Sequence, residues 1–115
     1  MCVLSTSAFA ATFNYNVAFP ALGGNVNLGY ETKSTNSSYF TASLTGGTAP
    51  AIWVWGINDA ANRTITAKQK VLKSSGTNTV YYKAGETLNS GSVLRVRADA
   101  GSIYNETGSG DIDVK

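Results

Sequence analysis

Hydrophobic and polar residues alternate with a period of two along most of the chain. Between residues 13 and 19, every second position is aromatic or aliphatic, and the positions between them are small or polar. This alternation predicts β-strands with one buried and one solvent-facing side, since successive side chains of a strand point to opposite faces. The pattern predicts strands over residues 13–19, 25–31, 39–44, 52–57, 63–73, 79–83, 93–98 and 111–115.

The pattern also makes specific assignments within these segments. Residues 25–31 are predicted to turn Tyr30 inward, together with the aliphatic residues at alternate positions. Residues 63–73 are predicted to form one long strand that turns Ala67 inward. The last strand is expected to be short, beginning after a glycine-rich stretch that ends at Gly110.

About eight short strands, spaced near ten residues apart and separated by segments rich in Gly, Asn and Ser, indicate an all-β fold. We expect a two-sheet antiparallel β-sandwich, because each sheet then hides its apolar face against the other. A small closed β-barrel is the alternative. A length of 115 residues suits a single domain.

The N-terminus has the character of a secretion signal. Residues 1–11 read MCVLSTSAFAA, a short apolar stretch followed by small residues that end in Ala8-Phe9-Ala10. Signal peptidase accepts such an Ala-x-Ala sequence. We therefore expect residues 1–10 to be the remnant of a longer signal peptide, residues 11–115 to be the mature domain, and the protein to be secreted. A chance tail of small residues is the alternative.

The residue inventory removes most catalytic chemistry. The chain has no histidine, and its single cysteine, Cys2, lies in the segment that we expect to be lost. A Ser-His-Asp triad, a cysteine nucleophile and a thiolate or imidazole metal site therefore have no side chains to build them. We expect no catalytic residue, no metal site and no cofactor, and hence a protein that is not an enzyme.

Charge is distributed unevenly. Residues 63–97 carry a net charge of +6 and the rest of the chain carries −4, which together give the overall +2. If the strands at 63–73, 79–84 and 93–98 were neighbours, their cations would share one face and bind an anionic cell-wall polymer or a membrane surface. The candidate binding residues are Lys68, Lys70, Lys83, Arg95 and Arg97. A solvated sheet face without a partner is the alternative, and the export signal and modest net charge argue against nucleic acid.

Aromatic residues form the second candidate site. Trp53 and Trp55 are spaced to lie on one face of one strand, and Tyr81 would extend a binding surface. Exposed, these rings would stack on the sugars of a glycan. The preferred interpretation puts both tryptophans in the core, with Ile52 and Val54 facing the other way, because few other bulky residues are available for its centre.

Two resemblances accompany these patterns. The segment from Lys68 onward, with Tyr81-Tyr82, the 94–98 stretch LRVRA and the closing Ser109-Gly110-Asp111, resembles uncharacterised small secreted β-domain proteins of Gram-positive bacteria. The region of Tyr39, Ser43 and Trp53 is more distantly similar to lactococcin 972-type bacteriocins. The resemblance implies a cysteine-free secreted β protein that acts on the cell envelope. Those bacteriocins often carry histidines and end in aromatic residues, unlike this chain, so no functional residue is carried over.

The combined expectation is a secreted, non-enzymatic, bacteriocin-like or otherwise antimicrobial domain that engages an anionic cell envelope through its basic face. A glycan-binding module and a structural surface subunit are the alternatives, and the sequence leaves the oligomeric state open.

Overall fold

Extended backbone dominates residues 11–115, the part of the chain that the computed structural model describes. The predicted signal remnant, residues 1–10, lies outside the described residues. The described part forms nine strands: β1 (Thr12–Phe19), β2 (Asn25–Thr32), β3 (Tyr39–Ala42), β4 (Ala51–Asn58), β5 (Arg63–Thr64), β6 (Gln69–Leu72), β7 (Asn78–Tyr81), β8 (Val93–Asp99) and β9 (Glu106–Asp113).

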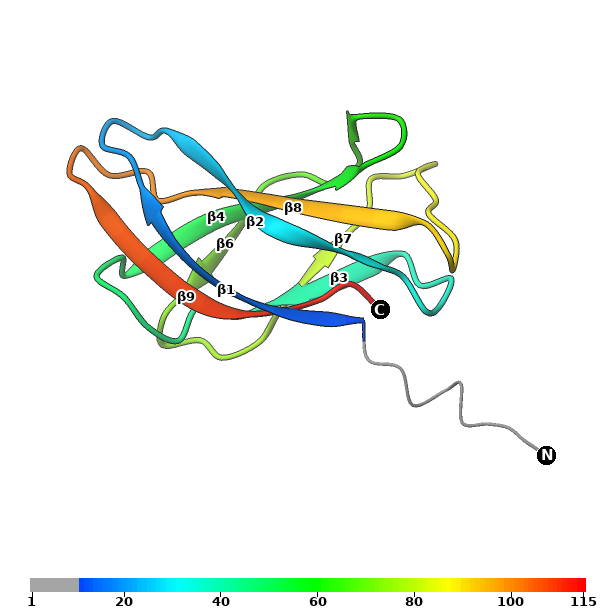
Figure 1. Cartoon of the computed structure of the whole chain (residues 1–115), viewed down its shortest axis with the longest axis horizontal. Helices are drawn as coiled ribbons and strands as arrows, with labels where there is room; N and C mark the ends of the chain where they lie inside the picture. The colour runs from blue at the N-terminus through cyan, green and yellow to red at the C-terminus, as the bar shows by residue number, and fades with distance from the viewer. Residues whose placement is uncertain (1–10) are drawn as a thin grey trace.

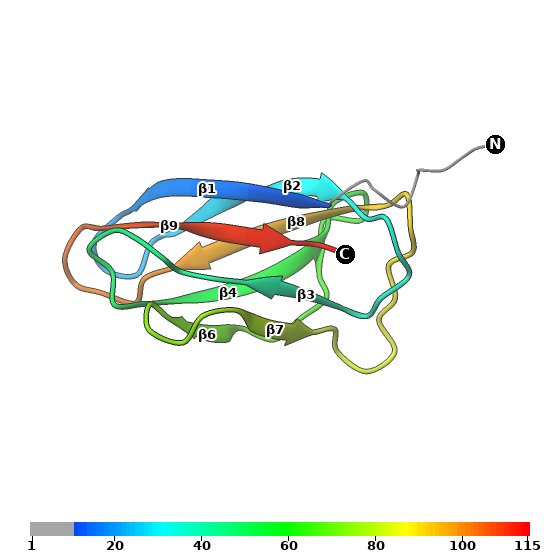
Figure 2. The ribbon, with the colours of Figure 1, turned by 90° about the horizontal axis from the view of Figure 1, so that it is seen from below.

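The strands form two antiparallel sheets. The first sheet has the order β1-β9-β3-β7, and the second has the order β2-β8-β4-β5, with β6 also paired to β4. Figure 2 looks onto the first sheet, with the second sheet behind it. The all-β sandwich is confirmed, and the sheets are not closed into the barrel that was the alternative.

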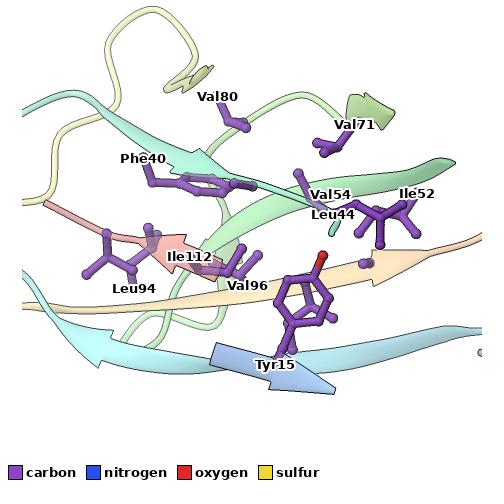
Figure 3. Close-up of a cluster of buried hydrophobic side chains, with 14 of the residues drawn as sticks. Tyr15, Phe40, Leu44, Ile52, Val54, Val71, Val80, Leu94, Val96 and Ile112 are labelled. Carbon is purple, nitrogen blue, oxygen red and sulfur yellow. The ribbon is translucent and has the colours of Figure 1, made fainter. Parts of the chain in front are cut away.

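The core lies between the sheets, where the alternation predicted it. Val54 and Val96 point inward from the second sheet toward Tyr15, Phe40 and their neighbours on the first (Figure 3). These four residues are buried, and the Tyr15 hydroxyl donates a 2.6 Å hydrogen bond to the Ser43 carbonyl. Branched aliphatic and aromatic side chains favour such half-buried pleated surfaces.

Strand β9 starts earlier than the sequence indicated, because two of its glycines are interior positions. A Cβ added at Gly110 would lie 2.1 Å from the Ser43 carbonyl oxygen, and one at Gly108 would lie 2.8 Å from the Phe19 ring. The close approach of neighbouring backbone and rings requires glycine here. A stretch with the composition of a loop is therefore part of a strand.

The predicted single strand over 63–73 is wrong. The chain forms the two-residue β5 and then β6, and Ala67 between them is exposed. Thr66 is buried in its place, and its Oγ1 accepts a 2.9 Å hydrogen bond from the backbone N–H of Gly56 on β4. This side-chain hydroxyl replaces the backbone partner that a continuous strand would supply, which interrupts the ladder.

The predicted inward position of Tyr30 is also wrong. The pairing of β2 with β8 shifts register between Asn27 and Gly29, as it does at a β-bulge. An extra residue reverses the facing of every later side chain in the strand. Tyr30 is consequently exposed and lies opposite Arg95 of β8.

Over residues 11–115, no helix has the length and apolarity to cross a membrane.

Candidate binding face

Trp53 and Trp55 point away from the core. Their neighbours on β4, Ile52 and Val54, are fully buried between the sheets, so the alternate positions must face outward. The preferred interpretation, which placed both tryptophans in the core, is therefore wrong. Two branched aliphatic side chains fill the space between sheets where we had expected indoles.

The two tryptophans differ in exposure although they share one face. Trp53 is 38% exposed, whereas Trp55 is only 7% exposed. Lys68 lies over the Trp55 ring, with Nζ 4.5 Å from the ring centroid, and Arg97 of β8 is the register partner of Trp55. The ammonium group of Lys68 therefore lies against the ring of Trp55 in a cation–π arrangement, and Trp55 is much less open to solvent than Trp53.

Trp53 has a cation on its other side. Lys70 of β6 is its register partner, and Lys70 Nζ lies 5.7 Å from the Trp53 ring centroid. On β8, Asp99 is the partner of Trp53. The row therefore runs lysine, tryptophan, aspartate across three adjacent strands, with the indole partly open to solvent.

The arginines of β8 are held by amides and a carboxylate at their sides. Arg97 Nη1 donates a 2.8 Å hydrogen bond to Asn27 Oδ1 of β2, and its Nη2 donates to Asn25 Oδ1. Arg95 Nη2 donates a 2.6 Å hydrogen bond to Asn62 Oδ1, and its Nε lies 3.7 Å from an Asp59 carboxylate oxygen. These partners fix the direction of both guanidinium groups, so the positive charge is presented in a defined arrangement.

The face keeps a positive balance. We call it the outer face, defined by the residues on the side of the second sheet that faces away from the core, Asn25, Asn27, Tyr30, Trp53, Trp55, Lys70, Arg95, Arg97 and Asp99, together with Lys68, which contacts Trp55 and Asp99. Its single acid, Asp99, is buried and forms an ion pair with Lys68, with 3.2 Å between Asp99 Oδ2 and Lys68 Nζ. Within residues 11–115, Lys70 and Arg97 have no carboxylate within 4.0 Å.

The structure brings together four of the five predicted cations, but not for the predicted reason. The strands at 63–73, 79–84 and 93–98 are not neighbours, because β4 lies between β6 and β8, and β7 belongs to the other sheet. Lys83 follows β7 and binds Ile65 through its backbone, off the strands of the outer face. Tyr81 is also on β7, where its ring packs 6.0 Å from that of Tyr39. Lys83 and Tyr81 therefore do not join the group.

Sequence reasoning missed Asn25, Asn27 and Tyr30 as members of this face. The two asparagines did alternate outward on a predicted strand, which was a usable signal. Tyr30 gave no such signal, since the bulge that turns it outward depends on pairing with β8.

One lysine is buried outside this face. Lys33 is 1% exposed, and its Nζ donates a 2.8 Å hydrogen bond to the Ser37 carbonyl and lies 5.2 Å from the Tyr82 ring centroid. Burial lowers the pKa of Lys33, an effect that the nearby Asp113 partly offsets.

Burial also raises the pKa of Tyr82 to about 12. The hydroxyl of Tyr82 has no hydrogen-bond partner among residues 11–115.

The outer face is a surface and not a cleft. Residues 11–115 contain no pocket and no cluster of side chains that could hold a metal ion. What the arrangement can do chemically is attract anions, donate directed hydrogen bonds from guanidinium groups, and stack one partly exposed indole on a flat apolar ring.

Comparison with known proteins shows the fold alone. No family model and no curated protein matches the chain. The crystal structure of the Yersinia pseudotuberculosis-derived mitogen is similar, with a TM-score of 0.60 and 16% identity over 93% of this chain and 88% of the mitogen chain. The crystal structure of PirA is also similar, with a TM-score of 0.49 and 9% identity over 87% of this chain and 91% of that chain. Neither is a lactococcin 972-type bacteriocin, and that resemblance stays a hypothesis.

Proposed function

We propose that this chain is a secreted, non-enzymatic binding domain whose outer face engages an anionic, sugar-containing polymer of a cell envelope. One observation carries the proposal: the partly exposed Trp53 lies on the same sheet face as Lys70 and Arg97. The sequence had offered a basic face and an aromatic platform as separate hypotheses. Their placement on one surface favours a ligand that has both negative charge and sugar rings.

The spacing of the cations suits a repeating polymer. Neighbouring strands lie about 4.8 Å apart, and alternate residues of a strand lie about 7 Å apart. Lys70 and Arg97 are two strands and one alternate position apart, so their backbones are separated by roughly 12 Å. An extended polymer that lies across the three strands would meet both charges with Trp53 between them.

Each group has a physical role in such binding. Lys70 acts as an unpaired point charge, whereas the guanidinium of Arg97, oriented by Asn25 and Asn27, offers directed hydrogen bonds to a carboxylate or phosphate. Trp53 supplies an apolar ring face for a sugar. Because these charges are at the surface and the screening length is about 8 Å at physiological salt, binding is expected to weaken steeply as salt rises.

The experiment measures binding of the full chain to three soluble polymers: polygalacturonate, polyglycerol phosphate and neutral dextran. Isothermal titration calorimetry at low and high sodium chloride gives the affinity and its salt dependence. We expect binding to the two anionic polymers and not to dextran, and more than tenfold weaker binding for Lys70→Glu/Arg97→Glu, on the order of 1.4 kcal/mol or more. Circular dichroism verifies that each variant is folded.

The matched control is Lys73→Glu/Lys83→Glu, which changes net charge by the same amount at two exposed lysines off the outer face. Equal losses in both double variants would mean that net charge alone drives binding, which contradicts the proposal. A Trp53→Ala variant separates the two ligand features. Unchanged affinity for polygalacturonate would remove the stacking role, and binding of dextran would favour the neutral glycan-binding alternative.

A further inference from the structure

Two loops form an exposed apolar tip at one end of the sandwich. They are the β1–β2 loop, residues 20–24, and the β8–β9 loop, residues 100–105, and they lie side by side at the end opposite to the C-terminus (Figures 1 and 2). Together they expose three large apolar side chains, Leu22 at 82%, Ile103 at 67% and Tyr104 at 69%. We call these three residues the apolar tip.

Several backbone N–H groups of the two loops are paired within the protein. The N–H groups of Leu22 and Gly23 donate to the Ser102 carbonyl at 2.9 and 3.2 Å, and the Ala21 N–H donates to Asn105 Oδ1 at 2.9 Å. The Tyr104 N–H donates to Ser102 Oγ at 3.0 Å. Polar groups that are paired within the protein can leave water at small cost, which is a requirement for entering an apolar medium.

Leu22 is held in a costly conformation. Its φ of 66° is in the left-handed region, which bulky side chains rarely adopt, and the following Gly23 has a φ of 75°. The N–H groups of Leu22 and Gly23 donate to the Ser102 carbonyl in this conformation, but the leucine side chain itself gains no burial from it. Strained backbone positions of this kind cluster at functional sites, where the surrounding structure holds them in place.

The chemistry of the tip indicates its occupant. Residues 20–25 and 100–105 contain no charged side chain, and the tip projects from the molecule. A second copy packed tip to tip would contribute three large side chains, far fewer than the roughly 20–30 residues a side of a stable interface, and residues 11–115 present no pocket that could receive the tip. A lipid bilayer needs no recess, because it accepts aliphatic side chains in its hydrocarbon and aromatic rings at its headgroup level.

Trp53 adjoins this tip. A Cβ added at Gly101 would lie 3.4 Å from Trp53 Nε1, so the β8–β9 loop runs beside the indole. Indoles with one apolar side and one polar N–H favour the membrane–water boundary. Trp53 therefore stands where the outer face and the apolar tip meet.

We propose that the apolar tip of Leu22, Ile103 and Tyr104 inserts into the interface of a lipid bilayer and docks the domain on a membrane surface. This contact is apolar and goes beyond the binding of anionic polymer by the outer face. It persists at high salt, because it does not depend on charge. The half-buried Glu106, which begins β9 beside the tip, limits how deeply the loops enter.

The test is partitioning of the full chain onto phosphatidylcholine vesicles, measured by flotation in 0.5 M sodium chloride. We expect the wild-type chain to bind the vesicles. The partition coefficient of the double variant Ile103→Ser/Tyr104→Ser should be lower by a factor of about ten or more. The control is Tyr81→Ser, since Tyr81 is also 69% exposed but lies on β7 of the first sheet. It should bind as wild type does. Thermal unfolding followed by circular dichroism verifies folding, and the single variant Ile103→Ser replaces the double variant if the latter is destabilised.

Quenching by brominated phosphatidylcholine supplies a second readout. Trp53 fluorescence should be quenched on binding, and Trp53→Phe should remove most of the quenching because Trp55 is covered. The proposal is overturned if wild type does not bind these vesicles, if the double variant binds equally well, or if 0.5 M salt abolishes binding. Self-association through the tip, seen by sedimentation velocity, would overturn it as well. The outer face is tested separately with soluble polymers, which tip variants should still bind.

Discussion

Leu22 provides the sharpest test of the apolar tip, because one substitution is expected to stabilise the fold and weaken membrane docking together. The change is Leu22→Asn. A bulky residue in the left-handed region costs roughly 1–2 kcal/mol, and asparagine adopts that region more readily. The side chain is 82% exposed, so its replacement removes little burial. We expect a gain in unfolding free energy of about 1 kcal/mol.

That gain translates into a measurable shift in melting temperature. Unfolding entropy is about 2.1 cal/mol/K per residue, or about 0.2 kcal/mol/K for a domain of this size, so Tm should rise by about 4–5 °C. Scanning calorimetry and urea unfolding check the gain, and vesicle flotation checks the expected loss of partitioning. Ile103→Asn is the control, since Ile103 has no positive φ. It should lose partitioning without a gain in Tm.

Two outcomes would refute the reasoning. An unchanged or lower Tm for Leu22→Asn would mean that the left-handed conformation of Leu22 carries no strain. A higher Tm with unchanged partitioning would mean that Leu22 does not contact lipid, although its strain is real.

Further predictions concern the core and its ionisable groups. Gly110→Ala should cost more than about 3 kcal/mol in urea unfolding, because its Cβ would lie 2.1 Å from the Ser43 carbonyl oxygen. Gly76→Ala, at φ +70° in open space, should cost only about 1 kcal/mol, and equal losses would contradict this steric account. Burial raises the pKa of Tyr82 to about 12 in the folded chain, so above pH 10 the unfolded chain releases this proton first. The free energy of unfolding should therefore fall as pH rises above 10, and Tyr82→Phe should reduce that fall. Burial lowers the pKa of Lys33 in the folded chain, so between that lowered pKa and 10.5 the unfolded chain binds more protons than the folded chain does. The free energy of unfolding should therefore rise with pH over this range, and Lys33→Met should flatten the rise.

The in-and-out alternation of β4 and β8 could be predicted from sequence, because it is a local property of extended backbone. On β8, Leu94 and Val96 alternate with Arg95 and Arg97, and the structure buries the two aliphatic residues and turns the two arginines outward, as the alternation predicts. The same alternation put Trp53 and Trp55 on one side of β4. It could not decide which side was solvent, because Ile52 and Val54 are also apolar, and packing against the first sheet made that choice.

Strand pairing was beyond the sequence. Lys68 and Lys70 lie on the same face as Arg97 because β6 and β8 both pair with β4, one on each side of it. The sequence pattern had suggested instead that the strands carrying these cations pair directly with one another and with the strand that carries Lys83. Pairing depends on contacts between residues far apart in the chain, and no local pattern encodes them. The glycines of β9 illustrate the same limit, since Gly110 is required by the carbonyl of Ser43, 67 positions earlier.

By itself, the sequence determined an all-β chain and the residue types from which any binding surface must be built, and it favoured two packed sheets over a closed barrel. Only the tertiary structure decided which of those residues meet. The register of β2, β4, β6 and β8 brought the cations and Trp53 together, a bulge turned Tyr30 outward, and hydrogen bonds between two loops 80 residues apart assembled the apolar tip. The physical reason is that side-chain alternation is set by the backbone of each strand, whereas register, bulges and loop contacts are set by the partners that folding places beside it.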